Sequence, residues 1–248
     1  MNMKIIRRFL ASEVVYQSNF IREWWHRDYG PAKCREYIIR NATDLERYHP
    51  SGRGERTGPP RMICVEGTIP PEINGVELFR RISRECIEPG HIKEVELLGN
   101  IDAQLQRELN AIPGIFAVGA VPRDEVPKRL READIYLSLE INPPCPNAVI
   151  EALASGLAVT GFNTGSLAEL VGPGSDYLAP YGGDPWRLES PDHGALIERI
   201  VYLAQNYSES GFAARRFAES SYSRKQMVEQ YIEVINEALS SCAHEVAS

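Results

Sequence analysis

From about residue 61 to residue 162 the sequence alternates short apolar runs with amphipathic stretches, and this alternation constrains the fold more than any other feature. The short runs are typical of buried strands, and the stretches between them carry apolar residues at helical spacing. Successive strand–helix–strand units form a parallel sheet covered by helices on both faces, and right-handed crossovers make it doubly wound. We therefore predict an α/β fold with a Rossmann-like, doubly wound parallel sheet.

The predicted strands of this sheet are MICVEG, HIKEVELLG, GIFAVGA, DIYLSL and LAVTGF. The predicted helices between them are a stretch at about 76–86, AQLQREL, DEVPKRLREA and the alanine-rich run that ends before Gly156. Three helices are expected to close the chain, one starting near Ser190, one at about 211–220 and one at 224–239. Ligands of such sheets bind at the carboxyl ends of the strands, so the loops there are the places to look for a site.

The first sixty residues are too short for a domain of their own. EVVYQS reads as a strand, NFIREWWHRDYG as a helix and EYIIRN as a second strand, and one such unit cannot bury an independent core. The Gly- and Pro-rich segment that follows has the composition of a linker. The expected organisation is an N-terminal strand–helix–strand remnant of a domain at 1–48, a linker at 49–61, a sheet domain at 62–222 and a closing helix at 223–241.

Charge and composition exclude several classes of function. The net charge of −7 disfavours nucleic-acid binding, although residues 1–60 carry an excess of lysine and arginine. That basic segment is either a solvated arm or a contact with an anionic membrane surface or an acidic partner. The five cysteines are scattered and never spaced as metal ligands, so we expect no metal site, and with no signal-peptide pattern we expect a cytoplasmic protein.

The stretch NPPCPNAVIEALASGLAVTGFNTGS, from Asn142 to Ser166, has the features of a binding device. Prolines 143, 144 and 146 stiffen the entry to a helix, and Glu151 follows about one turn inside it. The N-terminus of a helix presents free backbone N–H groups and the positive end of the helix dipole, which together attract anions.

This stretch resembles the donor-site signature of the family 4 retaining glycosyltransferases of the GT-B fold. NTGSLAELV (163–171) resembles the glycine turn that follows the signature, and residues 119–139 resemble the strand–loop–helix–strand before it. Upstream, VVYQSNFIREWWHRDYG and IIRNATDLERYHP resemble the end of that fold's acceptor domain. The resemblance runs from about residue 13 to residue 239, and it implies that the sheet is the C-terminal, donor-binding domain of a GT-B enzyme.

The resemblance implies an enzyme of carbohydrate biosynthesis. Such a transferase moves a hexosyl group from a UDP- or GDP-linked sugar to an acceptor with retention, while the leaving phosphate helps to deprotonate the acceptor. It needs no cofactor besides this nucleotide-sugar substrate and no obligatory metal. The sequence does not identify the acceptor, which in this family ranges from lipids and polysaccharides to small metabolites.

Site residues are implied by position in the matched motifs. Backbone amides near Pro146, Asn147 and Ala148 would face the diphosphate, and Glu151 would accept hydrogen bonds from the ribose hydroxyls. The remaining donor-binding positions are Gly67 and Thr68 after the first strand, Val121 and Arg123 beside the base, and Gly165 and Ser166 in the glycine turn.

The sequence departs from the family pattern in three ways. Pro143 stands where the family has an acid that contacts the donor sugar, so the candidate catalytic acid is Glu140, three residues earlier. Thr68 and Ile73, with Asn74 next, stand where the family has an arginine and a lysine that neutralise the diphosphate.

Most of the acceptor domain is also absent, so we expect a partner chain that supplies it, or a homodimer. The alternatives to a split enzyme are a nucleotide-sugar-binding regulatory subunit with little chemistry and a truncated, inactive relic.

Overall fold

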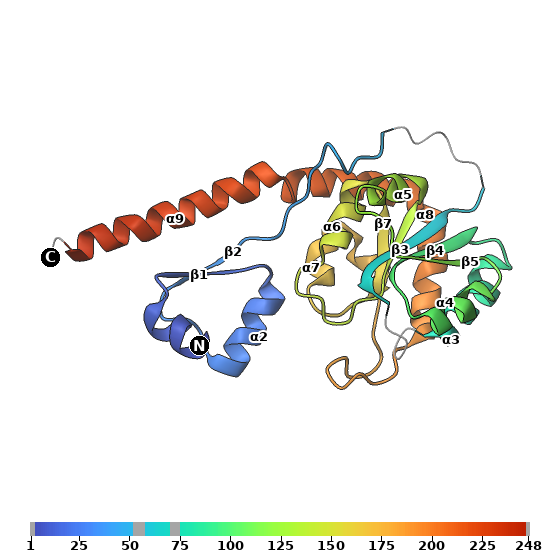
Figure 1. Cartoon of the computed structure of the whole chain (residues 1–248), viewed down its shortest axis with the longest axis horizontal. Coiled ribbons are helices and arrows are strands. Elements are labelled where there is room, and N and C mark those ends of the chain that lie inside the picture. The colour runs from blue at the N-terminus through green and yellow to red at the C-terminus, as the bar shows by residue number, and fades with distance from the viewer. Residues whose placement is uncertain (1–2, 52–57, 70–74, 247–248) are drawn as a thin grey trace.

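The computed structural model of the chain describes residues 3–51, 58–69 and 75–246. The expected linker at 49–61 therefore lies partly outside the described residues, and so do Ile73 and Asn74. The main body is a parallel sheet between helices, and a smaller N-terminal unit lies beside it (Figure 1).

Six parallel strands form the sheet, in the order β5-β4-β3-β6-β7-β8. They are β3 (Arg61–Thr68), β4 (Glu94–Asn100), β5 (Ile115–Gly119), β6 (Ile135–Ser138), β7 (Ala158–Phe162) and β8 (Leu178–Ala179). The chain builds outward from β3 to β5 and then returns to add β6, β7 and β8 on the other side. The carboxyl ends of β3 and β6 therefore flank the point where the order reverses, which is the usual ligand crevice of such sheets.

Helices cover both faces of the sheet, as the sequence predicts. The first face is covered by α3 (Val76–Ile82, continued by a π-helical turn at Ser83–Ile87) and α4 (Ala103–Asn110), and the second by α5 (Val126–Glu132), α6 (Asn147–Ala154) and α7 (Leu167–Val171). Side chains alternate along β3, because Met62 and Cys64 join one buried cluster while Ile63 joins the other. The prediction of a doubly wound α/β sheet is confirmed.

Helix α8 (His193–Ser221) corrects one prediction. The sequence predicts two helices with a break before Gly211, whereas α8 is continuous. A Cβ at Gly211 would lie only 2.5 Å from the backbone oxygen of Gly156. The glycine therefore permits close packing of α8 against the turn between α6 and β7 and does not end a helix.

The N-terminal unit contains β1 (Glu13–Tyr16), α2 (Asn19–Tyr29) and β2 (Arg35–Ile38), close to the predicted strand, helix and strand. The two strands pair in parallel. A helical segment precedes them, α1 (Met3–Ile5) continued by a π-helix at Ile6–Leu10, which the sequence analysis did not predict.

Helix α2 has no fully buried residue, and the Glu36 carboxylate is the centre of the polar contacts in this unit. Glu36 accepts hydrogen bonds from the Tyr16 hydroxyl at 2.8 Å and the Ala32 N–H at 2.9 Å, and it lies 2.6 Å from His26 Nε2. Arg7, only 5% exposed, donates to the same Tyr16 hydroxyl at 2.6 Å. These polar contacts stabilise the unit together with ring contacts among Trp24, Trp25 and Tyr29.

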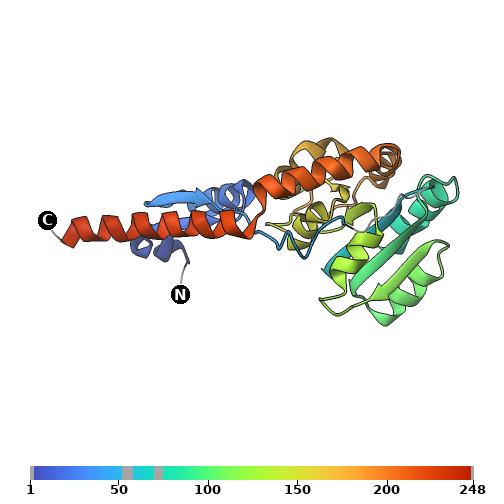
Figure 2. The same ribbon diagram turned by 90° about the horizontal axis from the view of Figure 1, so that it is seen from above.

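Helix α9 (Arg224–Val246) leaves the sheet domain and runs along the N-terminal unit (Figures 1 and 2). Glu237 on α9 accepts hydrogen bonds from Arg35 at 2.8 Å and from the Tyr37 hydroxyl at 2.6 Å. The apolar side chains along this helix are largely exposed. Its exposed members are Val228, Tyr231, Ile232, Ile235 and Leu239.

Replacing Gly211 by alanine tests the close packing of α8. Helix propensity alone favours alanine by up to about 1 kcal/mol. The clash with the Gly156 carbonyl should outweigh this, so we expect Gly211→Ala to lower the free energy of unfolding by about 1–3 kcal/mol in urea denaturation. Gly194→Ala, in the first turn of the same helix, is the control: its Cβ would closely approach only a side-chain oxygen of Asp192, at 3.2 Å, so its effect should be much smaller. Equal effects of the two substitutions would contradict the packing argument.

Candidate functional site

The loop from Asn142 to Pro146, between β6 and α6, is fixed through its carbonyl groups. Because prolines lack an N–H donor, the loop cannot be held by a regular backbone ladder. Three consecutive carbonyls instead accept hydrogen bonds from three distant parts of the chain. The pairs are Ser166 N–H to Pro143 (2.9 Å), the Ser18 hydroxyl to Pro144 (2.6 Å) and the Asn41 side-chain amide to Cys145 (3.1 Å). We call this loop, with the first turn of α6, the mouth.

The first turn of α6 is open to a ligand. Pro146 is the N-cap and provides no side-chain hydrogen bond to the helix, and there is no acid in the first turn. Asn147 is exposed and Ala148 is half-buried. The N–H groups at this end therefore have no side-chain cap, and they point toward the carboxyl edge of the sheet, where an anion would be stabilised.

The predicted glycine turn lies against the mouth. Gly165 adopts φ +59°, and a Cβ there would lie 2.5 Å from the Pro143 nitrogen, so only glycine fits. Ser166 follows, 1% exposed, and its hydroxyl has no hydrogen-bond partner among the described residues. A buried hydroxyl without a partner is costly and marks a position that a ligand can satisfy.

Glu151 lies on α6 near the segment that carries Arg47 and Tyr48 and near Arg123 of the β5–α5 loop. Its carboxyl group is half-buried, and this burial raises its pKa. A hydrogen-bonding interaction with the Tyr48 hydroxyl and the positive charges of Arg123 and Arg47 act in the opposite direction. Glu151 therefore faces polar groups rather than the interior of the sheet. Val121 and Arg123 belong to the loop beside it, and Arg47 donates to the Arg123 carbonyl at 3.0 Å.

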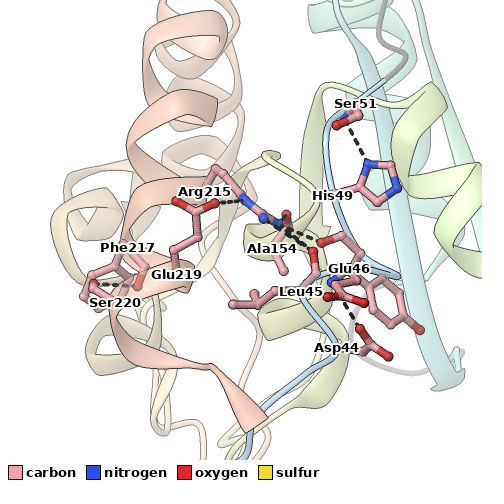
Figure 3. A network of polar contacts seen from close by, with 11 residues as sticks. Asp44, Leu45, Glu46, His49, Ser51, Ala154, Arg215, Phe217, Glu219 and Ser220 are labelled. Carbon is pink, nitrogen blue, oxygen red and sulfur yellow. Dashed lines mark hydrogen bonds and ion pairs between the residues drawn. The ribbon is translucent and has the colours of Figure 1, made fainter. Parts of the chain in front are cut away.

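Hydrogen bonds from Arg215 join α8 to the chain segment that carries Tyr48 (Figure 3). Its guanidinium donates to the carbonyls of Tyr48 at 2.8 Å and Leu45 at 3.3 Å, and also to the Ala154 carbonyl at the end of α6. It further pairs with Glu219 at 2.7 Å. This one side chain joins α8, α6 and the segment before the linker.

The carboxyl end of β3 brings two predicted donor-binding residues to the candidate site, and a glutamate that the sequence analysis did not select. Gly67 and Thr68 are exposed there, and Glu140 is exposed at the neighbouring end of β6. Glu66, which the sequence analysis did not select, accepts the Leu139 N–H at 3.1 Å, and burial raises its pKa to about 7. Its only signal in the sequence is a glutamate at the end of an otherwise apolar strand.

The predicted donor-binding residues thus belong to the carboxyl end of β3, to the loops that follow β5, β6 and β7, and to α6. Ile73 and Asn74 lie outside the described residues. Two cavities of the described structure, of about 240 and 380 Å³, lie elsewhere. The smaller is lined by residues such as Tyr177 and Ser210, and the larger by residues such as Phe116 and Arg129.

The family model described as glycosyl transferases group 1 matches residues 60–206, more than half of the chain. The chain belongs to this glycosyltransferase family. The matched range covers the sheet and the mouth but not the N-terminal unit. No curated protein matches the sequence.

Solved glycosyltransferase structures share the fold at low sequence identity. A glycosyltransferase from Rickettsia africae ESF-5 is 15% identical, with a TM-score of 0.74 over 96% of this chain and 67% of that one. HepE from Anabaena, in complex with UDP and glucose, is 16% identical, with a TM-score of 0.73 over 94% and 65%. The pneumococcal O-GlcNAc transferase GtfA, in complex with UDP and GlcNAc, is 16% identical, with a TM-score of 0.68 over 92% and 46%.

These matches support the GT-B fold class for this glycosyltransferase chain, which spans only part of each solved structure. Within the part of the chain that the structure describes, no group of three or more His, Cys, Asp or Glu residues is arranged to hold a metal ion. No helix in that part is both long and apolar enough to cross a membrane.

The titration of Glu66 makes stability depend on pH. The folded protein keeps this proton up to about pH 7, whereas an exposed glutamate loses it near pH 4.5. The free energy of unfolding should therefore fall as pH rises through this window, by up to about 3 kcal/mol. Urea denaturation from pH 5 to pH 8 should show a smaller fall for Glu66→Gln than for the wild type. The exposed Glu198→Gln should behave like the wild type, and so would Glu66→Gln if this assignment were wrong.

Proposed function

We propose that this chain is a family 4 retaining hexosyltransferase that binds a UDP- or GDP-linked sugar at the carboxyl edge of its sheet. The observation that carries the proposal is the uncapped N-terminus of α6 with Glu151 one turn further along the same helix. Two similar structures hold UDP together with a sugar, which supports UDP as the first nucleotide to test.

The proposed donor-binding roles follow from the positions of the residues in the matched motifs. The N–H groups of Asn147 and Ala148 bind the diphosphate, aided by the turn at Gly165 and Ser166. Glu151 accepts hydrogen bonds from the ribose 2′- and 3′-hydroxyls, and an ionised acceptor strengthens both. The loop at Val121 and Arg123 lies beside the base, and Gly67 and Thr68 lie at the carboxyl end of β3, which neighbours β6 in the sheet.

The transfer breaks the bond between the anomeric carbon and the donor phosphate oxygen and forms a bond from that carbon to an acceptor hydroxyl oxygen. The acceptor proton passes to the departing phosphate, so no cofactor is required. Pro143 cannot replace the family's acid, because a proline side chain has no carboxyl group. Glu140, exposed at the end of β6, is the residue proposed to contact the donor sugar.

A further chain or a second copy completes the acceptor side in this proposal. The exposed apolar stripe on α9 and the small parallel β1–β2 pair offer surfaces that such a partner would cover.

The acceptor itself is unassigned. The proposed location is the cytoplasm, with the basic N-terminal segment in peripheral contact with a membrane.

A binding module with little chemistry is the second candidate, and Thr68 is the observation that favours it. Without a cation at this position the diphosphate leaving group is less well neutralised, which weakens chemistry more than recognition. Slow donor hydrolysis or transfer that is lost in Glu151→Ala favours the enzyme. Binding without turnover favours the module, and an inactive relic binds no nucleotide.

Calorimetric titration with UDP and GDP tests donor binding. We expect Glu151→Ala to weaken binding of the preferred nucleotide by about 10- to 100-fold, because hydrogen bonds to a charged acceptor are each worth about 1.5–3 kcal/mol. Glu198→Ala, an exposed change on α8, should leave affinity unchanged. The proposal fails if the wild type binds neither nucleotide or if Glu151→Ala binds as tightly as the wild type.

A further inference from the structure

Three side-chain amides form a continuous chain from the N-terminal unit to the mouth. Gln17 Nε2, just after β1, donates to Asn41 Oδ1 at 3.1 Å. Asn41 Nδ2, just after β2, donates to Asn147 Oδ1 at 2.9 Å and to the Cys145 carbonyl at 3.1 Å. We call Gln17, Asn41 and Asn147 the amide relay.

The Cys145 carbonyl fixes the direction of the relay. A carbonyl only accepts, so the Asn41 atom that faces it must be the donor Nδ2. The same nitrogen faces Asn147, whose facing atom must then be the acceptor Oδ1. Asn41 Oδ1 is left to accept from Gln17. One backbone carbonyl thus sets the orientation of three amides.

The last amide then has both of its N–H donors directed away from Asn41. Asn147 is exposed and is the first residue of α6, beside uncapped backbone N–H groups. If its amide were reversed, it would present an oxygen to an incoming anion and repel it. The relay excludes that orientation, because Asn41 Nδ2 would then face a second donor.

A second observation at the mouth also points to a ligand. Ser166, whose N–H binds the Pro143 carbonyl at 2.9 Å, has a hydroxyl that is 1% exposed and has no partner among the described residues. A buried hydroxyl of this kind is normally satisfied by protein, water or ligand. It belongs to the turn packed on the mouth loop and is independent of the relay.

We propose that Asn41 and Gln17 are positioning residues that hold the Asn147 side-chain amide as a neutral donor for the diphosphate of the bound nucleotide. This inference rests on the proposed function and adds a side-chain donor to a site in which Thr68 of β3 stands where the family has a cation. It also makes diphosphate binding depend on the docking of the N-terminal unit, because two members of the relay belong to that unit.

The test is a double-mutant cycle on the full chain, with whichever of UDP or GDP the wild type binds. Asn41→Ala and Asn147→Ala should each weaken binding by about 3- to 10-fold, and the double variant should lose no more than the weaker-binding single variant. Asn41→Asp should be worse than Asn41→Ala, because its carboxylate favours the reversed Asn147 amide and adds negative charge. Asn236→Asp, which makes the same charge change on exposed α9, should bind like the wild type.

Losses that multiply in the double variant, or an Asn41→Ala variant that binds like the wild type, would overturn the relay. Thermal unfolding of each variant separates loss of fold from loss of positioning. Gln17→Glu, at an exposed residue, is a further variant that should also weaken nucleotide binding. If Glu151→Ala abolishes binding while the relay variants do not weaken it, the proposed function stands and only this inference fails. If the wild type binds neither nucleotide, both are wrong.

Discussion

The three carbonyls of Pro143, Pro144 and Cys145 are the constraint on which the candidate site depends. Each accepts a hydrogen bond from a different part of the chain, namely the glycine turn, the start of α2 and the end of β2. A loop rich in proline has few N–H groups of its own, so its position is set by these outside donors. They fix where α6 begins and therefore where its N–H groups point.

Two of these contacts, those from Ser18 and Asn41, also join the N-terminal unit to the sheet domain. Glu169 of α7 adds to them by accepting the N–H groups of Asn19 and Phe20 at the start of α2, and Trp186 stacks on Phe20 with ring centroids 5.9 Å apart. The N-terminal unit is thus held in place by hydrogen bonds and aromatic contacts at the edge where the donor is proposed to bind. In the proposed function, recognition of the nucleotide therefore depends on groups that also dock this unit.

The sequence predicts the sheet and the mouth because both depend on local patterns. Apolar runs give β3 to β7, and the prolines before an alanine-rich run mark the start of α6. The break predicted before Gly211 is wrong, because a glycine that permits close packing looks the same in sequence as one that ends a helix. Asn41 contacts Cys145, which is 104 residues away, and Arg215 contacts Tyr48, which is 167 residues away. No local pattern reveals such contacts. Glu66 looks like an ordinary strand end until its burial is known.

The most direct measurement of the central claim is a crystal structure of the full chain with the nucleoside diphosphate that it binds. The account predicts phosphate oxygens within hydrogen-bond distance of the Asn147 and Ala148 N–H groups and the ribose hydroxyls on the Glu151 carboxylate. A nucleotide bound elsewhere, such as in the cavity lined by Tyr177 and Ser210, would contradict it. So would a diphosphate that leaves the N-terminus of α6 unoccupied.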